Sequence, residues 1–483
     1  MRREKITTFE LDCLHESWLI KLSRDFFTDT NMLLSFTVAN FRSFREEQTL
    51  SLIAQKRFAD HADHCIPLPD GDLQALPIAI FYGANGAGKS NLIKALHFTV
   101  QLVKSGIPPQ GMVPVQPFCL GGTEGLASKF EVRFVADGKT FGYGFELEVD
   151  YVKAEWLDLY EKGKSRPLFE RAGVPDGSPT VEISPKLKDD SAKVGALGFV
   201  GVRRNQLFLS AIREAIESDD QGEFVRSILK WMEHVSIVPH DVRQLDLGYF
   251  LEVDPLLNEF VGDYLRNSGT GIDRLKIVKT LIEHRLDEKE QSQLKIEQSS
   301  RKKGEIKLIK LNINGRSRMV ALDDSEQLAI HEIVAQHQME NGDWVDLSME
   351  EQSDGTRRLA ELLLPLQFLQ FSETVVLIDE LDRSLHPLLA KKFLESFLRM
   401  HKGQLIITTH ETRLLDLELL RRDEIWFAEK DESKATHIYP LADFPVRNDL
   451  RVEKGYLQGR FGAIPFLGGI NALLEQQSQQ TTS

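Results

Sequence analysis

The chain has 483 residues, of which 42% are hydrophobic, so it is long enough for two or three lobes around a sizeable core. Its 59 Lys and Arg against 73 Asp and Glu give a formal charge of −14, which excludes a protein that coats nucleic acid with its whole surface. The three scattered cysteines, Cys13, Cys65 and Cys119, indicate no disulfide framework and favour a reducing compartment.

No apolar run approaches the roughly 18 residues that cross a bilayer, and charge interrupts every apolar stretch of residues 1–31. The sequence therefore predicts a cytoplasmic protein with no membrane partner. His61, His64 and Cys65 lie close together, but a fourth ligand and the usual second pair are missing. A surface loop is therefore favoured there over a metal cluster.

Strands and helices alternate along the chain in a way that predicts an α/β fold. A β pattern over 33–40 is followed by a buried strand at 76–82, a glycine-rich loop and a helical stretch at 91–105. Alternating runs between 130 and 160 are broken by Asp137-Gly138, which predicts a hairpin within an antiparallel sheet. Asn314-Gly315 predicts another hairpin, and aliphatic runs at 374–378 and 404–408 are typical of a parallel sheet that is covered on both faces.

Helical periodicity from about residue 205, ending in a polar, charge-rich stretch, indicates an insertion that splits the core in sequence. We therefore expect five segments: an N-terminal extension at 1–31, a first core part at 32–204, a mainly helical inserted lobe at 205–303, a second core part at 304–445 and a tail at 446–483.

The glycine-rich loop carries the clearest chemical signal. It satisfies G-x-x-x-x-G-K-[ST], a pattern whose backbone N–H groups surround a nucleotide phosphate at a helix N-terminus. The lysine then reaches the β- and γ-phosphate oxygens, and the serine hydroxyl is a ligand for Mg²⁺. The predicted ATP-binding residues of this loop are Gly83, Ala84, Asn85, Gly86, Ala87, Gly88, Lys89 and Ser90.

Two further strand ends complete a candidate catalytic set. Asp379 and Glu380 follow the strand at 374–378, where a parallel sheet presents ligands, so Asp379 is predicted to hold Mg²⁺ and Glu380 to orient the attacking water. His410 follows the next strand, which predicts an imidazole beside the γ-phosphate. The predicted catalytic residues are thus Glu380, His410 and Lys89.

A fourth element, at Ser353, Asp354 and Gly355, precedes a helix that leads into the acidic strand. A serine, a glycine and a helix N-terminus together can bind a γ-phosphate. Within one chain, however, the glycine-rich loop already binds the phosphates of the nucleotide. This segment would therefore contact the nucleotide that is bound to another subunit. An ordinary helix cap remains an equally good interpretation.

In this order, GANGAGKS, QSDGTRRL, LIDELDRSLHP and TTH, the chain resembles ABC-type ATPase heads of the SMC, RecF and OLD-like branch over roughly 33–150 and 340–445. The segment NFRSF at 40–44 is similar to the N-terminal motif of that branch, which places Arg42 and Ser43 beside the nucleotide. The resemblance implies a P-loop head with a mixed core sheet and an antiparallel sheet. It also implies that two heads of a homodimer or higher homo-oligomer enclose ATP and Mg²⁺.

Two positions depart from that pattern. The signature segment lacks two consecutive glycines, and His386 stands where the D-loop acid is expected. Gln116 is a weak candidate for the Q-loop glutamine and for a Mg²⁺ contact.

The tail at Asn448–Leu467, with GTGI at 269–272, resembles stand-alone ATPases of phage-defence systems, such as those of the PARIS (AriA) and RloA types. That resemblance implies a separate Toprim-fold nuclease as effector and a phage-encoded trigger. No spare acidic pair follows His410 on a strand end, so this chain is not expected to cut nucleic acid itself.

Two other functions stay open at this point. A RecF-like repair ATPase would bind DNA through a basic stretch, although a solvated hairpin edge explains the same charges. That stretch comprises Arg301, Lys302, Lys303, Lys307, Lys310, Arg316 and Arg318. A transporter ATPase subunit is disfavoured by the missing double glycine and by the insertion.

Overall fold

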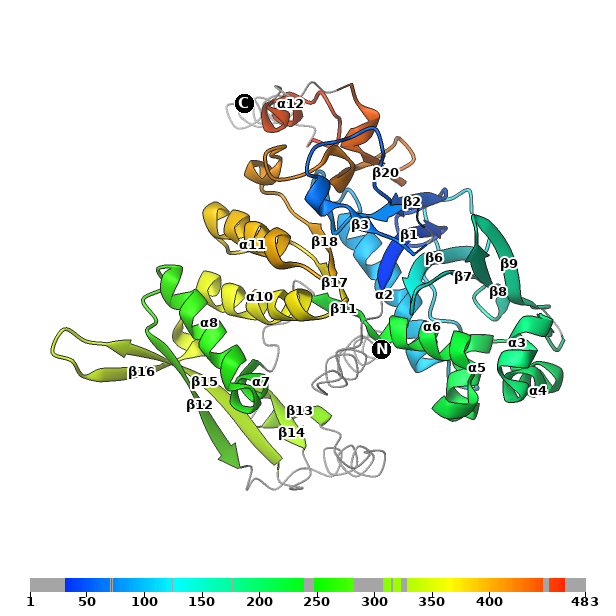
Figure 1. Ribbon diagram of the computed structural model, residues 1–483, viewed down its shortest axis with the longest axis horizontal. Coiled ribbons are helices and arrows are strands. Elements are labelled where there is room, and N and C mark those ends of the chain that lie inside the picture. The colour runs from blue at the N-terminus through cyan, green and yellow to red at the C-terminus, as the bar shows by residue number, and fades with distance from the viewer. Residues whose placement is uncertain are drawn as a thin grey trace, which may run out of the picture.

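The computed structural model describes residues 31–69, 71, 73–123, 125–175, 177–238, 247–281, 307–313, 316–322, 328–445 and 451–464. Within these residues, helices pack around three larger sheets, and a two-stranded ribbon joins β3 (Ile66–Pro67) to β4 (Gln74–Ala75) (Figure 1).

The central sheet is mixed, with five parallel strands and one antiparallel edge strand. Its residues alternate between two cores: Ala79 and Phe81 face one, while Ile78 and Ile80 face the other. Burial on both faces explains why its strands read as unbroken aliphatic runs. The order is β11 (Val235–Val238), β17 (Val375–Ile378), β18 (Gln404–Thr408), β5 (Ile78–Tyr82), β19 (Ile425–Lys430) and β20 (Thr436–Pro440).

A seven-stranded antiparallel sheet covers one side of this core. The predicted hairpin is confirmed, since Asp137 and Gly138 connect two paired strands at φ values of 47° and 72°. The order is β10 (Thr180–Ile183), β9 (Lys164–Ala172), β8 (Val152–Glu161), β7 (Lys139–Leu147), β6 (Ser128–Ala136), β1 (Met32–Ala39) and β2 (Gln48–Ser51).

Helices cover both faces of the central sheet. In Figure 1, α10 and α11 lie on one side of β17 and β18, and α2 lies on the other. Local signals set their starts: Ser353 caps α10, and proline is the first residue of α8 and α11. The helices are α2 (Lys89–Ser105), α3 (Pro185–Asp190), α4 (Ala192–Val200), α5 (Phe208–Ala215), α6 (Glu223–Glu233), α7 (Leu247–Val253), α8 (Pro255–Asn267), α10 (Asp354–Phe371), α11 (Pro387–Met400) and α12 (Val452–Leu457).

The insertion differs from the mainly helical lobe expected at 205–303. Its first part belongs to the core, because α5 and α6 pack against α2 and β11 joins the central sheet. The part that extends away, at the lower left of Figure 1, combines α7 and α8 with a five-stranded sheet. That sheet contains β12 (Arg274–Leu281), β15 (Leu328–Gln338), β14 (Arg316–Leu322), β13 (Lys307–Ile313) and β16 (Trp344–Ser348).

The hairpin predicted at Asn314-Gly315 is confirmed by the pairing of β13 with β14, although both turn residues lie outside the described set. Of the basic stretch, residues 301–303 also lie outside it. Segments 1–30, 446–450 and 465–483 are likewise not described.

The described part of the tail packs on the core, because Tyr456 stacks on Phe427 of β19 with ring centroids 5.5 Å apart. Phe461 stacks on the same ring at 5.8 Å. The GTGI segment lies between α8 and β12, and its Thr270 hydroxyl donates a hydrogen bond to the carbonyl of Leu265.

His97 on α2 gives the fold a testable pH dependence. Its Nε2 is buried without a hydrogen-bond partner among the described residues. Burial lowers the pKa of His97 from 6.5 to about 4, and the Lys104 charge adds to this. The unfolded chain therefore binds more protons than the folded chain between these values, and stability falls as the pH is lowered from 6.5 toward 4.

His97→Leu removes this titration, so the free energy of unfolding of the variant should rise relative to the original chain by about 2 kcal/mol between pH 7.5 and pH 5. Urea denaturation at the two pH values measures the difference. If the difference in free energy of unfolding between His97→Leu and the original chain does not change with pH, His97 is protonated as easily in the folded as in the unfolded chain.

Candidate active site

The phosphate-binding loop connects the buried strand β5 to helix α2. Gly83 must lack a side chain, because a Cβ there would lie 2.3 Å from the carbonyl oxygen of Ala428. Gly86 and Gly88 have φ values of 77° and 106°, in the region that favours glycine. The strand, loop and helix predicted from the sequence are thus in place, and the loop ends at the N-terminus of α2.

Lys89 lies under this loop. Its Nζ donates to the carbonyls of Gly83 and Ala84 at 2.8 and 3.2 Å, and to Nε2 of His410 at 3.2 Å. Burial lowers the pKa of Lys89 to about 8, against the opposing effect of three carboxylates. The three hydrogen bonds hold the Lys89 ammonium group beside the position that a bound phosphate would take.

Asp379 and Ser90 meet directly. The Ser90 hydroxyl donates to Asp379 Oδ1 at 3.0 Å, and the Thr408 hydroxyl donates to the same oxygen at 2.6 Å. Asp379 is itself only 3% exposed. A hydroxyl and a carboxylate at this separation form an oxygen donor pair of the kind that Mg²⁺ uses.

Glu380 follows with a left-handed backbone at φ 51°, which is costly for a residue with a side chain. The conformation is held on both sides: its N–H donates to the Thr408 hydroxyl at 2.8 Å, and Arg358 donates to its carbonyl at 3.4 Å. Backbone strain maintained in this way is typical of functional sites. Here it directs the Glu380 carboxylate into the cavity described next.

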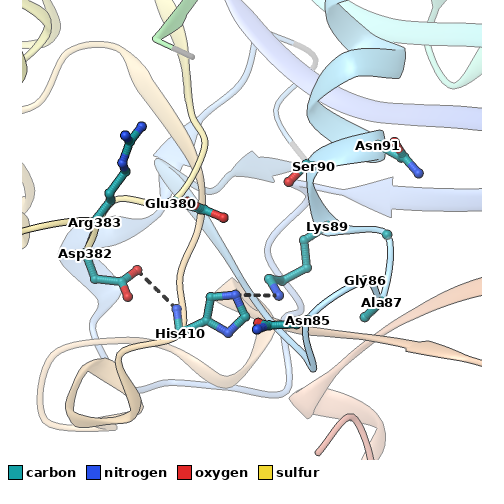
Figure 2. A pocket seen from close by; sticks show the side chains of 11 residues that line it. Asn85, Gly86, Ala87, Lys89, Ser90, Asn91, Glu380, Asp382, Arg383 and His410 are labelled. Atoms are coloured by element: carbon teal, nitrogen blue, oxygen red, sulfur yellow. Dashed lines mark hydrogen bonds between the residues drawn. The ribbon is translucent and has the colours of Figure 1, made fainter. Parts of the chain in front are cut away.

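His410 lies at the end of strand β18 and also lines this cavity. Asp382 Oδ1 accepts from the backbone N–H of His410 at 3.1 Å and from the Thr409 hydroxyl at 2.6 Å (Figure 2). Burial lowers the pKa of His410, and the nearby Lys89 charge lowers it further. Because an ammonium group only donates, the contact with Lys89 identifies the ring as neutral, with Nε2 as acceptor.

Of the residues described above, Lys89, Ser90, Glu380, Asp382 and His410 line one cavity of about 370 Å³. Figure 2 shows Glu380 and Ser90 on its upper side, with Lys89 and His410 below them. The cavity is lined by Asn85, Gly86, Ala87, Gly88, Lys89, Ser90, Asn91, Glu380, Asp382, Arg383 and His410.

Ser43 supports the loop from behind and does not line the cavity. Its hydroxyl accepts from Asn91 Nδ2 at 2.8 Å and lies within hydrogen-bonding distance, 2.9 Å, of the Thr436 hydroxyl. Arg42 lies beside Phe41, with the guanidinium carbon 5.6 Å from the ring centroid. Gln116 is exposed, and its carbonyl accepts the Arg42 N–H at 2.7 Å. Gln116 is absent from the cavity lining, so the geometry gives its predicted Mg²⁺ contact no support.

The signature segment also lies outside this chain's cavity. Ser353 and Asp354 are exposed, and the Ser353 hydroxyl caps α10 by accepting the Thr356 N–H at 3.1 Å. A Cβ at Gly355 would lie 2.6 Å from the carbonyl oxygen of Ser384, so the segment packs tightly on the loop that follows Glu380. His386, at the end of that loop, is exposed and caps α11.

Comparison with known families identifies the class of protein. The profile of the family described as "AAA domain, putative AbiEii toxin, Type IV TA system" matches residues 78–200 and 209–416. The chain belongs to this family. The match spans the phosphate-binding loop, the acidic strand end and His410, which makes the chain a P-loop ATPase of the AAA type. No curated protein matches the sequence.

Among solved structures, the chain is similar to three SMC heads. The head domain from Thermotoga maritima has 13% identity and a TM-score of 0.36, covering 84% of this chain and 98% of that one. An SMC head bound to the C-terminal winged-helix domain of ScpA has 12% identity and a TM-score of 0.34, covering 84% and 97%. A head with an extended coiled coil, bound to the C-terminal domain of ScpA from Pyrococcus furiosus, has 12% identity and a TM-score of 0.34, covering 89% and 99%.

Several residues of the site were missed by the sequence analysis. Asp382 and Arg383 directly follow the acidic pair, so their proximity in sequence could have revealed them. Arg358 carried a weaker signal, a cation on the buried face of α10. Thr436 carried none, although its hydroxyl donates to the Ala87 carbonyl at 2.8 Å, because 349 residues separate the two.

None of the helices among the described residues is both long and apolar enough to span a membrane.

Proposed function

We propose that the chain hydrolyses ATP to ADP and phosphate in a Mg²⁺-dependent reaction. The observation that carries this proposal is that Lys89, Ser90, Glu380 and His410 line one cavity of about 370 Å³. Asp379 lies behind this lining and accepts a hydrogen bond from Ser90. Residues with these chemical properties, in this arrangement, supply the positioning and electrostatic stabilisation on which phosphoryl transfer depends.

Each residue has a distinct task. The loop amides and Lys89 bind the phosphates, and Ser90 with Asp379 would hold Mg²⁺, which neutralises developing charge when it is bound. Glu380 orients the attacking water. His410, kept neutral by burial, contacts the γ-phosphate and reports its presence through Asp382.

The catalytic unit in this proposal is a pair of heads in a homodimer or higher homo-oligomer. Ser353, Asp354 and Gly355 form a helix N-terminus that is exposed except for its contact with the loop after Glu380, and none of the three lines the cavity of its own chain. Such a terminus attracts phosphate. We assign it to the nucleotide of the second copy.

The biological role that we propose is that of an anti-phage sensor in the cytoplasm, whose ATP state determines whether a separate effector, such as a Toprim-fold nuclease, is held or released after a phage-encoded trigger is detected. The family description names a toxin of a type IV toxin–antitoxin system, which supports a role beside a second component. The resemblance of the tail to defence ATPases supports the same role.

A pair of experiments tests this role. Cells that carry the chain with its native gene neighbours should lose protection against phage when Lys89→Ala is introduced, and the neighbouring gene product should co-purify with the original chain. Equal plaque counts for the variant and the original chain would contradict the proposed role without bearing on ATP hydrolysis itself.

A further inference from the structure

A group of histidines lies on the loop between β2 and β3, outside the ATP site. The loop carries a short 3-10 helix, η2 (Ala62–His64), where the sequence favours a surface loop. In the structure His64 is only 4% exposed, and its partner Glu424 is fully buried. The interpretation as a simple surface loop was therefore wrong for His64.

The loop is held in place by a buried ionic network. Arg421 pairs with Asp423 at 2.9 Å and donates to the carbonyl of Asp60 at 2.7 Å. Asp423 in turn accepts the N–H of Gln55 at 2.8 Å. Gln55 and Asp60, which precede the histidines, are thus fixed by a segment more than 350 residues later in the chain. The histidines are preorganised.

Each imidazole has one nitrogen occupied by an acceptor. His61 Nε2 lies 2.8 Å from the carbonyl oxygen of Leu417, which can only accept, so the proton is on Nε2 and Nδ1 keeps a lone pair. His64 Nδ1 lies 2.9 Å from Glu424 Oε1, and against an ionised carboxylate it leaves the lone pair on Nε2. Metal-binding histidines show this pattern, with the second nitrogen donating to a carboxylate or backbone carbonyl.

Three potential ligand groups lie close together on this loop. One nitrogen of each imidazole and one carboxylate oxygen of Asp63 all lie within 4.8 Å of one another. His61 adopts a left-handed backbone at φ 50°, a strained conformation that the surrounding contacts maintain. Asp63 is exposed, which leaves the group open to solvent.

We propose that His61, Asp63 and His64 form a site for a divalent transition-metal ion, with Zn²⁺ as the ion that best suits two imidazoles and a carboxylate. Water fills the remaining coordination position. All three ligands lie on the β2–β3 loop, and the hydrogen bonds of the two imidazoles connect that loop to Leu417 and Glu424, which precede β19. The site is independent of the proposed ATP hydrolysis.

The test uses the full chain, with any affinity tag removed, after chelator treatment and without nucleotide. Calorimetric titration with Zn²⁺ should give one equivalent bound, and Co²⁺ should give the visible absorption of a low-symmetry site. His61→Ala and Asp63→Asn change the two accessible ligands and should each weaken Zn²⁺ binding at least about 10-fold. The buried His64 is left unchanged so that folding is not compromised.

Two control variants place the ion. His386→Ala removes an exposed histidine elsewhere, and Asp379→Asn changes the proposed Mg²⁺ site; both should retain the Zn²⁺ equivalent. Absence of stoichiometric binding, or binding that His61→Ala and Asp63→Asn leave unchanged, would overturn the proposal. Loss of the equivalent in Asp379→Asn alone would assign the ion to the ATP site and overturn it equally.

Discussion

Glu380→Gln should lower ATP turnover by at least about 100-fold while ATP still binds with nearly unchanged affinity. The amide matches the carboxylate in size but cannot accept a proton from the attacking water. Because Thr408 and Arg358 hold the Glu380 backbone, we expect the substituted side chain to keep its place at the cavity. Binding and turnover are therefore expected to separate in this variant.

Phosphate release and equilibrium ATP binding measure the two properties. Glu418→Gln is a matched control, since it makes the same chemical change at an exposed residue that does not line the cavity. Turnover by Glu380→Gln equal to that of the control would contradict the role assigned to Glu380.

Gly88→Ala should reduce ATP affinity by at least about 100-fold and destabilise the fold by about 2–4 kcal/mol. Gly88 has φ 106°, and an added Cβ would lie 2.1 Å from the Thr436 hydroxyl oxygen and 2.8 Å from that of Ser43. The clash must displace either the loop or β20. Either movement disturbs the hydrogen bond from Thr436 to Ala87 that fixes the loop.

Gly138→Ala separates backbone strain from this clash. Gly138 has a positive φ of 72°, but no atom lies within 4 Å of the position that its Cβ would take. Gly138→Ala should therefore lower the free energy of unfolding by only about 1 kcal/mol and leave ATP affinity unchanged. Denaturation and binding of a fluorescent ATP analogue measure both variants. Equal effects of Gly88→Ala and Gly138→Ala would show that the packing of Thr436 on the loop has no influence on binding.

The parts of the site that the sequence predicted are those in which a motif and its supporting element are adjacent in the chain. The loop at 83–90 lies between β5 and α2, and the acidic pair directly follows β17. Contacts across long sequence separations could not be predicted in this way. Thr436 behind the loop and Glu424 beside His64 are examples, since neither residue is marked by a local pattern.

The strands of the inserted lobe could not be predicted from local sequence patterns either. β11 is a four-residue apolar run, too short to distinguish from a buried helical turn by periodicity. β12 pairs with β15, about 50 residues later, and this pairing gives the lobe its sheet. Local helical periodicity in α7 and α8 was detected, but the strands between and beyond them depend on partners far along the chain.

In the proposed enzyme each ATP site contains residues from two copies of the chain, and a mixing experiment tests this composition most directly. Lys89→Ala removes the phosphate contact of its own site. Ser353→Asp keeps a good helix cap but places a negative charge where the partner's phosphate would lie. Each variant alone should be inactive.

Random pairing of equal amounts makes half of the dimers mixed, and each mixed dimer has one intact site, so the mixture should recover about a quarter of the original ATP turnover. A mixture no more active than its separate components, or full activity of Ser353→Asp alone, would contradict the composite site.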